Sequence, residues 1–363
     1  MKILMITNEY NNFFKFRYDL INFLINQKSS LKLSLLAKFD GYEKKFSSDE
    51  INKNNINISS RGLGIKSNIS NFFSIIINIF RINPIVIITF TIKPNFFLCI
   101  LKFFFRFKLI INITGLGEIF LNKNLSYRII RFFFIKFLSQ SNTIICQNED
   151  DKKFLISKNS KLKNKIKLIP GSGIKILKFN FYHNEKINFL FVGRIIKEKG
   201  VVEFIQASKI ISEKYKNIVQ FTIIGQIYDK NKFNSHFFSL LKKSNIKYHG
   251  YKENILEYIK RSSCIVLPSY REGLSRFLLE GLSLGKPIIT TNVPGCKQLV
   301  KNNKNGFLVN SKDVNSLVNA ITSFIELSDK KKLQFAINSH KYSKFYSSDK
   351  VDNLYLKYIN ELI

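Results

Sequence analysis

Short apolar runs alternate with longer amphipathic stretches along this chain, and that alternation most restricts its fold. The runs have the length and β-branched content of buried strands, and the stretches between them have the length of helices. Such alternation predicts a doubly wound parallel sheet covered by helices. The strands expected in the first half are 2–7, 33–37, 85–89, 109–114, 142–146 and 166–169. The helices expected there are 16–25, 68–80, 96–105, 127–138 and 149–157.

The pattern starts again after Pro170, in a turn-like segment that ends at Ile174. The strands expected in the second half are 188–192, 220–224, 247–249, 264–267, 287–290 and 306–309. A chain of 363 residues is long enough for two α/β domains. We therefore predict two Rossmann-like domains, 1–170 and 171–345, joined near 174–184.

Two glutamates in the second domain suggest a ligand site. Glu272 lies in the loop after a predicted buried strand, where open α/β sheets bind ligands. Glu280 lies on the following helix, which we expect to begin near Ser275 and to end at Gly285. Two carboxylates around a helix N-terminus can hold two sugars with a diphosphate between them. The alternative is a solvated loop glutamate and an ordinary helix glutamate.

A second set of charges follows the strand that ends at Gly193. Arg194, Lys197 and Lys199 precede a helix that we expect to begin near Val201. Cations beside a helix N-terminus suit a diphosphate, because arginine makes forked contacts and lysine supplies a point charge. Lysine is abundant in this chain, so a surface cation is the alternative interpretation of either residue alone.

Taken together, these residues resemble the retaining glycosyltransferases of family 4, which have the GT-B fold. Their signature, two glutamates separated by seven residues, is met by Glu272 and Glu280. The likeness is strongest to the bacterial capsule and lipid-linked-oligosaccharide branch and extends in order from Lys2 to Lys344. The other motifs that carry it are Phe16-Arg17, Thr91-Ile92-Lys93-Pro94, Thr114-Gly115-Leu116-Gly117-Glu118-Ile119-Phe120, Gln147-Asn148-Glu149-Asp150-Asp151 and Ile169-Pro170-Gly171-Ser172-Gly173-Ile174.

The resemblance implies transfer, with retention and without a metal or other cofactor, of a hexose or N-acetylhexosamine from a UDP-sugar. The implied acceptor is a polyprenyl-diphosphate-linked saccharide in bacterial surface polysaccharide or glycan assembly, such as capsule or O-antigen. The first domain would hold this acceptor. A helix within 346–363 would return to that domain.

The same resemblance implies roles for individual residues. Glu272, Arg194 and Lys199 would be catalytic. Glu272 would hold the donor sugar, Glu280 the ribose, and Arg194 with Lys199 the diphosphate. The implied donor-binding set is Gly193, Arg194, Lys199, Tyr251, Glu272, Gly273, Leu274, Ser275 and Glu280. The implied acceptor side comprises Arg17, Thr114, Gly115, Gly117 and Glu118, with a first loop at 8–14.

The net charge of +33 favours anionic partners, although a lysine-rich composition explains part of it. Segment 51–148 holds twelve Lys or Arg, fifteen Phe and one acid, Glu118. Basic, phenylalanine-rich helices can lie on an anionic bilayer, or can simply pack on the sheet. Three charges inside 96–113 argue against a membrane span, and 1–7 is too short for a signal peptide. We therefore expect a cytoplasmic protein bound peripherally to the inner membrane face.

Three other functions stay open at this stage. A nucleotide-sugar 2-epimerase shares the fold, but its histidine-rich catalytic set is not evident. A nucleic-acid-binding protein would suit the charge, yet no recognition motif is present, so no nucleic-acid partner is expected. An inactive partner in a glycan-assembly complex would not need the charged residues named above. The four cysteines and four histidines lack the spacing of a metal site.

Overall fold

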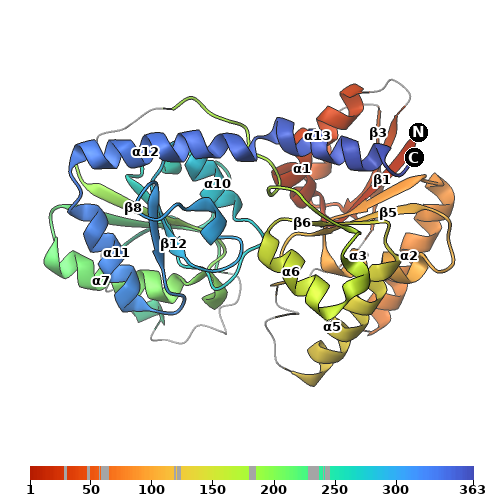
Figure 1. Ribbon diagram of the computed structural model, residues 1–363, viewed down its shortest axis with the longest axis horizontal. Helices are drawn as coiled ribbons and strands as arrows, with labels where there is room; N and C mark the ends of the chain where they lie inside the picture. Colours follow the sequence, from red (N-terminus) through yellow and green to blue (C-terminus); the bar gives the residue numbers. More distant parts are fainter. Residues whose placement is uncertain are drawn as a thin grey trace. The chain divides into compact units, whose positions relative to one another are not determined.

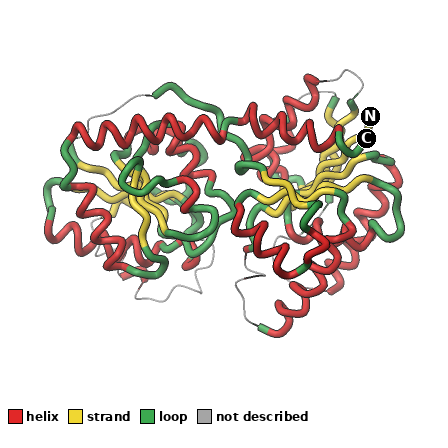
Figure 2. The backbone as a smooth tube through the Cα atoms, viewed as in Figure 1, coloured by secondary structure: helices red, strands yellow, loops and turns green. Residues whose placement is uncertain are grey.

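The computed structural model describes residues 1–27, 31–46, 50–56, 58, 65–117, 120, 124–179, 185–227, 237–239, 241 and 246–363. These residues form two compact units. The first consists of Met1–Gly173 with Ser348–Ile363, and the second of Ile174–Ser347. Each unit is one parallel sheet with helices on both faces (Figures 1 and 2).

The sheet of the first unit has seven parallel strands in the order β3-β2-β1-β4-β5-β6-β7. Their bounds are β1 (Lys2–Glu9), β2 (Lys32–Lys38), β3 (Ile51–Asn55), β4 (Val86–Thr89), β5 (Lys108–Ile113), β6 (Thr143–Cys146) and β7 (Ile166–Leu168). Strand β3 was not among the predicted strands. It is an edge strand that pairs only with β2, and most of its side chains are polar, so it lacks an apolar run.

The helices of the first unit are α1 (Tyr10–Gln27), α2 (Ile65–Ile82), α3 (Ile92–Leu101), α5 (Leu125–Phe137), α6 (Glu149–Lys158) and α13 (Ser348–Asn360). Alternate residues of β1 sort these helices between the two faces. Ile3 and Met5 pack with α1 and α13, whereas Leu4 and Ile6 pack with α2, α3, α5 and α6. Figure 1 shows the same two layers, with α13 beside α1.

The predicted first loop at 8–14 is wrong, because β1 extends to Glu9 and α1 begins at Tyr10. The reason lies in Tyr10, whose hydroxyl is buried and donates hydrogen bonds to the carbonyls of Leu35 (3.0 Å) and Asn54 (3.3 Å). These contacts hold the helix start directly against strands β2 and β3.

The sheet of the second unit has six parallel strands in the order β10-β9-β8-β11-β12-β13. Their bounds are β8 (Ile187–Val192), β9 (Val219–Ile224), β10 (Ile246–Tyr248), β11 (Cys264–Leu267), β12 (Ile288–Thr291) and β13 (Gly306–Val309). Its helices are α7 (Val201–Lys214), α9 (Leu256–Arg261), α10 (Arg276–Ser283), α11 (Val314–Ile325) and α12 (Asp329–Ser343). Helices α7 and α11 pack together on one face, and α9 and α12 pack beside α10 on the other.

Single-turn 3-10 helices complete the two units. They are η1 (Tyr42–Lys45), η2 (Leu138–Gln140), η3 (Ser160–Leu162), η4 (Lys197–Lys199), η6 (Lys297–Leu299) and η7 (Lys344–Tyr346). All four cysteines are buried and free. Among the described helices, none combines the length and apolar character that crossing a bilayer would need.

The strand order of each sheet reverses next to its first strand, between β1 and β4 and between β8 and β11. Loops at such a switch point diverge to opposite faces, and the gap at the strands' carboxyl ends receives ligands. In the second unit this point lies between the loop that contains Lys199 and the loop that contains Glu272. The predicted doubly wound sheets are therefore present, and they place both residues at the expected edge.

Candidate functional site

Lys199 and Glu272 meet across the switch point of the second unit. Lys199 ends η4, which follows β8, and Glu272 lies in the loop after β11. The Lys199 Nζ atom lies 2.5 Å from Oε1 of Glu272, and both side chains are mostly but not fully buried. The buried Ser269 hydroxyl donates a second hydrogen bond, 2.7 Å long, to the same oxygen. A cation and a carboxylate are thus held together where a ligand of an open sheet would bind.

The loop that contains Glu272 is supported by backbone contacts from both neighbouring loops. The amide of Tyr270 donates to the carbonyl of Glu198 (2.9 Å), and that of Glu272 donates to Pro294 (3.0 Å). Ser275 donates in the same way to Gly295, at 3.2 Å. These bonds join the loops after β8, β11 and β12, so the position of Glu272 depends on all three.

Two glycines permit this close approach of the loops. A Cβ atom on Gly200 would lie 2.0 Å from the carbonyl oxygen of Pro268. A Cβ atom on Gly295 would lie 2.3 Å from the carbonyl oxygen of Glu272. Both glycines also have positive φ angles, +71° and +79°, which other residues rarely adopt. Neither was predicted as a site residue, because their role depends on a neighbouring loop.

Tyr270 and Glu203 form a further contact that sequence reasoning missed. The Tyr270 hydroxyl donates to Oε1 of Glu203 at 2.6 Å, and Glu203 is buried in the first turn of α7. Burial, together with the hydrogen bond to this carboxylate, raises the pKa of Tyr270 above its usual value. The hydroxyl therefore stays protonated and keeps donating. This hydrogen bond joins the loop of Glu272 to α7, which follows β8, whereas Gly295 contacts the same loop from the side of β12.

Helix α10 carries the second glutamate of the predicted pair. Ser275 is its N-cap and its hydroxyl accepts from the amide of Leu278, as the expected helix start near Ser275 requires. The Nε of Arg276, one turn earlier on the helix, donates a hydrogen bond of 2.8 Å to Oε1 of Glu280. Oε2 of Glu280 is shielded and makes no hydrogen bond within the described part of the chain. That oxygen is an acceptor to which a ligand hydroxyl could donate. Gly273 is buried and Leu274 packs on the core.

Gly193, Arg194 and Tyr251 lie along the same edge of the sheet. The amide of Gly193 donates to Ile224, and that of Gly225 donates to Gly250, which links the loops after β8, β9 and β10. Arg194 is exposed directly after Gly193, and Tyr251 is 52% exposed in the loop after β10. The predicted donor-binding residues thus occupy one edge of one unit, with Tyr251 in the loop after its outer strand β10.

The predicted acceptor residues lie in the first unit. The Thr114 hydroxyl, after β5, donates to the carbonyl of Phe90 at 3.4 Å, and Gly115 and Gly117 both have positive φ angles. Arg17 on α1 is only 4% exposed, with its guanidinium 4.5 Å from the centre of the Phe90 ring. Glu118 lies outside the described residues. Arg17 is therefore packed inside its unit, stacked on an aromatic face.

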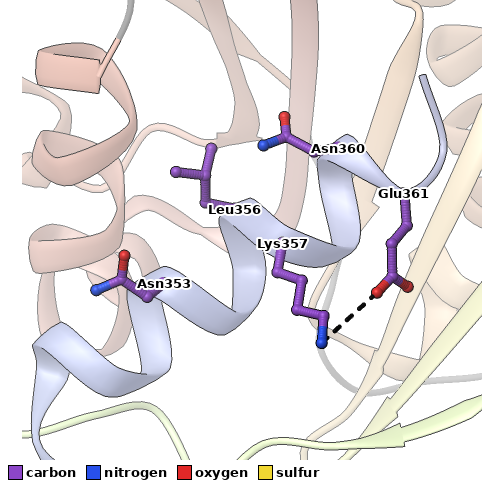
Figure 3. A pocket seen from close by; sticks show the side chains of 5 residues that line it. All are labelled: Asn353, Leu356, Lys357, Asn360 and Glu361. Atoms are coloured by element: carbon purple, nitrogen blue, oxygen red, sulfur yellow. Dashed lines mark ion pairs between the residues drawn. The ribbon is translucent and has the colours of Figure 1, made fainter.

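Two further features bear on where a ligand could bind. Within the described ranges, no three His, Cys, Asp or Glu side chains are grouped closely enough to hold a metal ion. A hollow of about 520 Å³ lies beside α13 (Figure 3). It is lined by Asn353, Leu356, Lys357, Asn360 and Glu361. Four of them belong to α13 and Glu361 follows it directly, so the hollow is an open helix face rather than a site built by converging loops.

Comparison with known proteins gives one family match. Residues 174–342, nearly the whole second unit, match the family described as Glycosyl transferases group 1. An Escherichia coli protein, UDP-Gal:alpha-D-GlcNAc-diphosphoundecaprenol alpha-1,3-galactosyltransferase, is 33% identical over 49% of this chain and 50% of its own length. The Campylobacter jejuni N,N'-diacetylbacillosaminyl-diphospho-undecaprenol alpha-1,3-N-acetylgalactosaminyltransferase is 26% identical over 71% of each chain.

The chain spans only about half the length of several curated relatives that it matches. The fold agrees over almost the whole chain with Anabaena Alr3699/HepE, solved in complex with UDP and glucose. The TM-score is 0.81 at 15% identity, covering 99% of this chain and 100% of that one. At this identity the likeness shows the fold alone. It confirms the predicted fold class, two Rossmann-like parallel-sheet units of the GT-B type.

Proposed function

Since residues 174–342 match the family described as Glycosyl transferases group 1, we propose that this chain is a retaining glycosyltransferase that uses a UDP-sugar. It transfers a hexose or N-acetylhexosamine to a polyprenyl-diphosphate-linked saccharide during bacterial surface polysaccharide or glycan assembly. The observation that carries the proposal is the Lys199–Glu272 pair at the switch point of the second sheet. The names of the two relatives, both acting on diphosphoundecaprenol-linked sugars, support this acceptor class.

The second unit holds the donor in this proposal. Glu272 accepts hydrogen bonds from sugar hydroxyls, and Glu280 accepts them from the ribose through its free oxygen Oε2. Tyr251 lies beside the base. Lys199 and Arg194, with the amides that begin α10, receive the diphosphate. The short bond between Lys199 and Glu272 keeps the cation beside the sugar site, so one residue pair contacts both halves of the donor.

The transfer step follows from these positions. The bond between the anomeric carbon and the diphosphate oxygen breaks, and the electron pair leaves with UDP. The acceptor hydroxyl oxygen bonds to the same carbon on the same face, and its proton passes to the departing phosphate oxygen. The developing negative charge on the phosphate is stabilised by Lys199 and Arg194, as preorganised donors stabilise other leaving groups. The alpha-1,3 product named for the Escherichia coli relative, which uses UDP-Gal, supports retention.

Metal independence is part of the same proposal. The two cations and the α10 amides supply the positive charge that a divalent ion supplies in other transferases. The proposed acceptor side is in the first unit, at Thr114, Gly115, Gly117 and Glu118, and Arg17, which is packed inside that unit, is left out of it. Because the acceptor is a membrane lipid, we place the protein at the inner face of the plasma membrane, bound peripherally.

The test is Glu272→Ala, assayed by mass spectrometry with UDP-sugars and a lipid-linked acceptor in detergent. We expect transfer to fall by a hundredfold or more, since losing one charge-assisted contact in the transition state costs about 3 kcal/mol. Glu257→Ala is the matched control, because it also removes a lysine-paired glutamate of the second unit, but an exposed one. Full activity in Glu272→Ala would refute the role. Epimerised UDP-sugar with no acceptor product would indicate the 2-epimerase instead.

A further inference from the structure

Large apolar side chains are exposed along one face of α2 in the first unit. Ile69, Phe73, Ile77 and Phe80 are spaced by four, four and three residues, which places them on one side of a helix. All four are more than half exposed, and Phe80 reaches 69%. The opposite side of α2, with Ile75 and Ile79, packs into the core. A helix that is apolar on its outer as well as its inner face has a second surface to cover.

This outer face continues onto α3 and α5 through aromatic contacts. The Phe80 ring lies 5.2 Å from Phe105, in the segment after α3, where Phe104 is 77% exposed. In the same segment Phe103 lies 6.0 Å from Phe137, which closes α5. Phe137 in turn contacts Phe133, and Phe133 contacts the exposed Phe132. Helices α2, α3 and α5 lie on the same side of the sheet (Figure 1). We call Phe73, Ile77, Phe80, Phe104, Ile129 and Phe132 the apolar surface.

Exposed basic residues accompany the apolar surface. On α5, Arg128 and Lys136 are exposed and share the face of Ile129 and Phe132 by helical spacing. Arg81 is exposed in the last turn of α2, and Arg106 and Lys108 are exposed after Phe104. Between 51 and 117 and between 124 and 148, the described residues include no acid. An apolar centre with basic residues on the same helices matches the interface of an anionic bilayer, into which rings insert while cations contact the headgroups.

A second copy of this chain fits this surface less well. Two copies would bring the basic residues of these helices together, and like charges that face each other across an interface are unfavourable. The surface is also close in the chain to the proposed acceptor residues. Thr114 and Gly117 follow β5, α5 is the next described helix of more than one turn, and Arg131 of α5 donates to the carbonyl of Phe120 at 3.0 Å.

We propose that the apolar surface is a membrane-docking face that inserts its phenylalanine rings into an anionic bilayer and so presents Thr114 and Gly117, after β5, to a lipid-linked acceptor. The docking stands on the exposed rings and the basic surround alone, whereas the acceptor rests on the proposed function. Binding then has two parts. The electrostatic part depends on anionic lipid and is screened by salt, and the apolar part persists in high salt.

The chain contains no tryptophan, so a single introduced tryptophan reports on its own surroundings. The experiment uses the full chain with Phe104→Trp, mixed with vesicles of phosphatidylcholine alone or with phosphatidylglycerol. We expect a blue shift of the emission and quenching by brominated acyl chains, both much larger with the anionic vesicles than with phosphatidylcholine alone. Phe345→Trp is the matched control, because Phe345 is also exposed but lies in the second unit. It should show neither change. Equal signals from the two reporters, or none from Phe104→Trp, would overturn the proposal.

Vesicle flotation then separates the two parts. In high salt, the triple variant Phe80→Ser, Phe104→Ser and Phe132→Ser should bind vesicles at least tenfold more weakly than the parent. A control triple with serine at Ile210, Ile218 and Phe345, all exposed in the second unit, should float like the parent. Arg128→Glu with Lys136→Glu should weaken binding mainly at low salt. Unchanged flotation of the phenylalanine triple variant would overturn docking. So would a parent protein that does not float and forms a dimer, if the triple variant is a monomer.

The two proposals can fail separately. Flotation needs neither donor nor acceptor, so docking can hold even if no sugar transfer is detected. If docking holds and the chain is a transferase, the phenylalanine triple should lose transfer to a membrane-embedded acceptor at least tenfold. It should retain transfer to a short-chain acceptor in solution. Equal losses with both acceptors would show that the triple damages the enzyme rather than its docking, and would overturn the link between surface and acceptor.

Discussion

Replacing Gly295 with alanine tests how the candidate site is supported, because it changes no charged group. Gly295 has φ of +79°, and an L-residue held in that region costs about 1–2 kcal/mol. The added Cβ would also lie 2.3 Å from the carbonyl oxygen of Glu272, 2.4 Å from its carbonyl carbon and 2.6 Å from the carbonyl oxygen of Gly273. Overpacking of this kind costs about 1–3 kcal/mol. The free energy of unfolding should therefore fall by roughly 2–5 kcal/mol.

The functional effect follows from which atoms must move. Contacts below 3.0 Å are essentially never seen for a Cβ, so the Glu272 backbone must retreat by about 0.7 Å or more. That shift would also strain the bonds from the Glu272 amide to Pro294 and from the Ser275 amide to Gly295. A displacement of about 1 Å at a reacting group can reduce the rate roughly a hundredfold. We expect kcat/KM to fall by about that factor, mainly through kcat.

The assay is UDP release in the presence of acceptor, with denaturant unfolding measured on the same samples. Gly41→Ala is the matched control, since Gly41 has φ of +91° but no atom within 4 Å of its added Cβ. It should lose about 1–2 kcal/mol and keep full activity. The reasoning would be refuted if Gly295→Ala stayed within twofold of the parent's activity and lost no more stability than Gly41→Ala.

Two further predictions concern charged groups. Lys199→Ala should weaken binding of UDP at least tenfold more than binding of uridine, as measured by calorimetry. Transfer by the parent should survive EDTA. Loss of activity in EDTA that magnesium or manganese restores would contradict the metal-free proposal. Asp352 is buried on α13, and burial, together with nearby Asp19, raises its pKa from 3.8 to about 7. A carboxyl whose pKa is higher in the folded chain releases its proton on unfolding between those values, so stability should fall as pH rises from about 4 to about 7. Asp352→Asn should remove that fall in stability, so it should raise the urea midpoint more at pH 8 than at pH 5. An equal change at both pH values would contradict the raised pKa of Asp352.

The sequence alone determined the order of strands and helices and the type of each sheet. Apolar periodicity is a local property, so it located nearly every buried strand of both units. It failed at β3, whose edge position lets it be polar, and at the start of α1, which Tyr10 extends through contacts with distant strands. It also placed Glu272 and Lys199 in loops at carboxyl ends of parallel strands. That placement needs only the element order, and the structure has both residues there.

Only the tertiary structure decided which residues meet. Lys199 and Glu272 are 73 residues apart in the chain, and their 2.5 Å contact exists because β8 and β11 are neighbours in the sheet. The support from Gly295 and Glu203 depends on the same long-range packing. Phe132, Phe133 and Phe134 are three consecutive phenylalanines, yet the first two are exposed and the third is buried. Helical geometry sets their directions, but only the sheet beneath α5 determines which direction is the core. Burial depends on neighbours that are distant in sequence, and local patterns do not contain them.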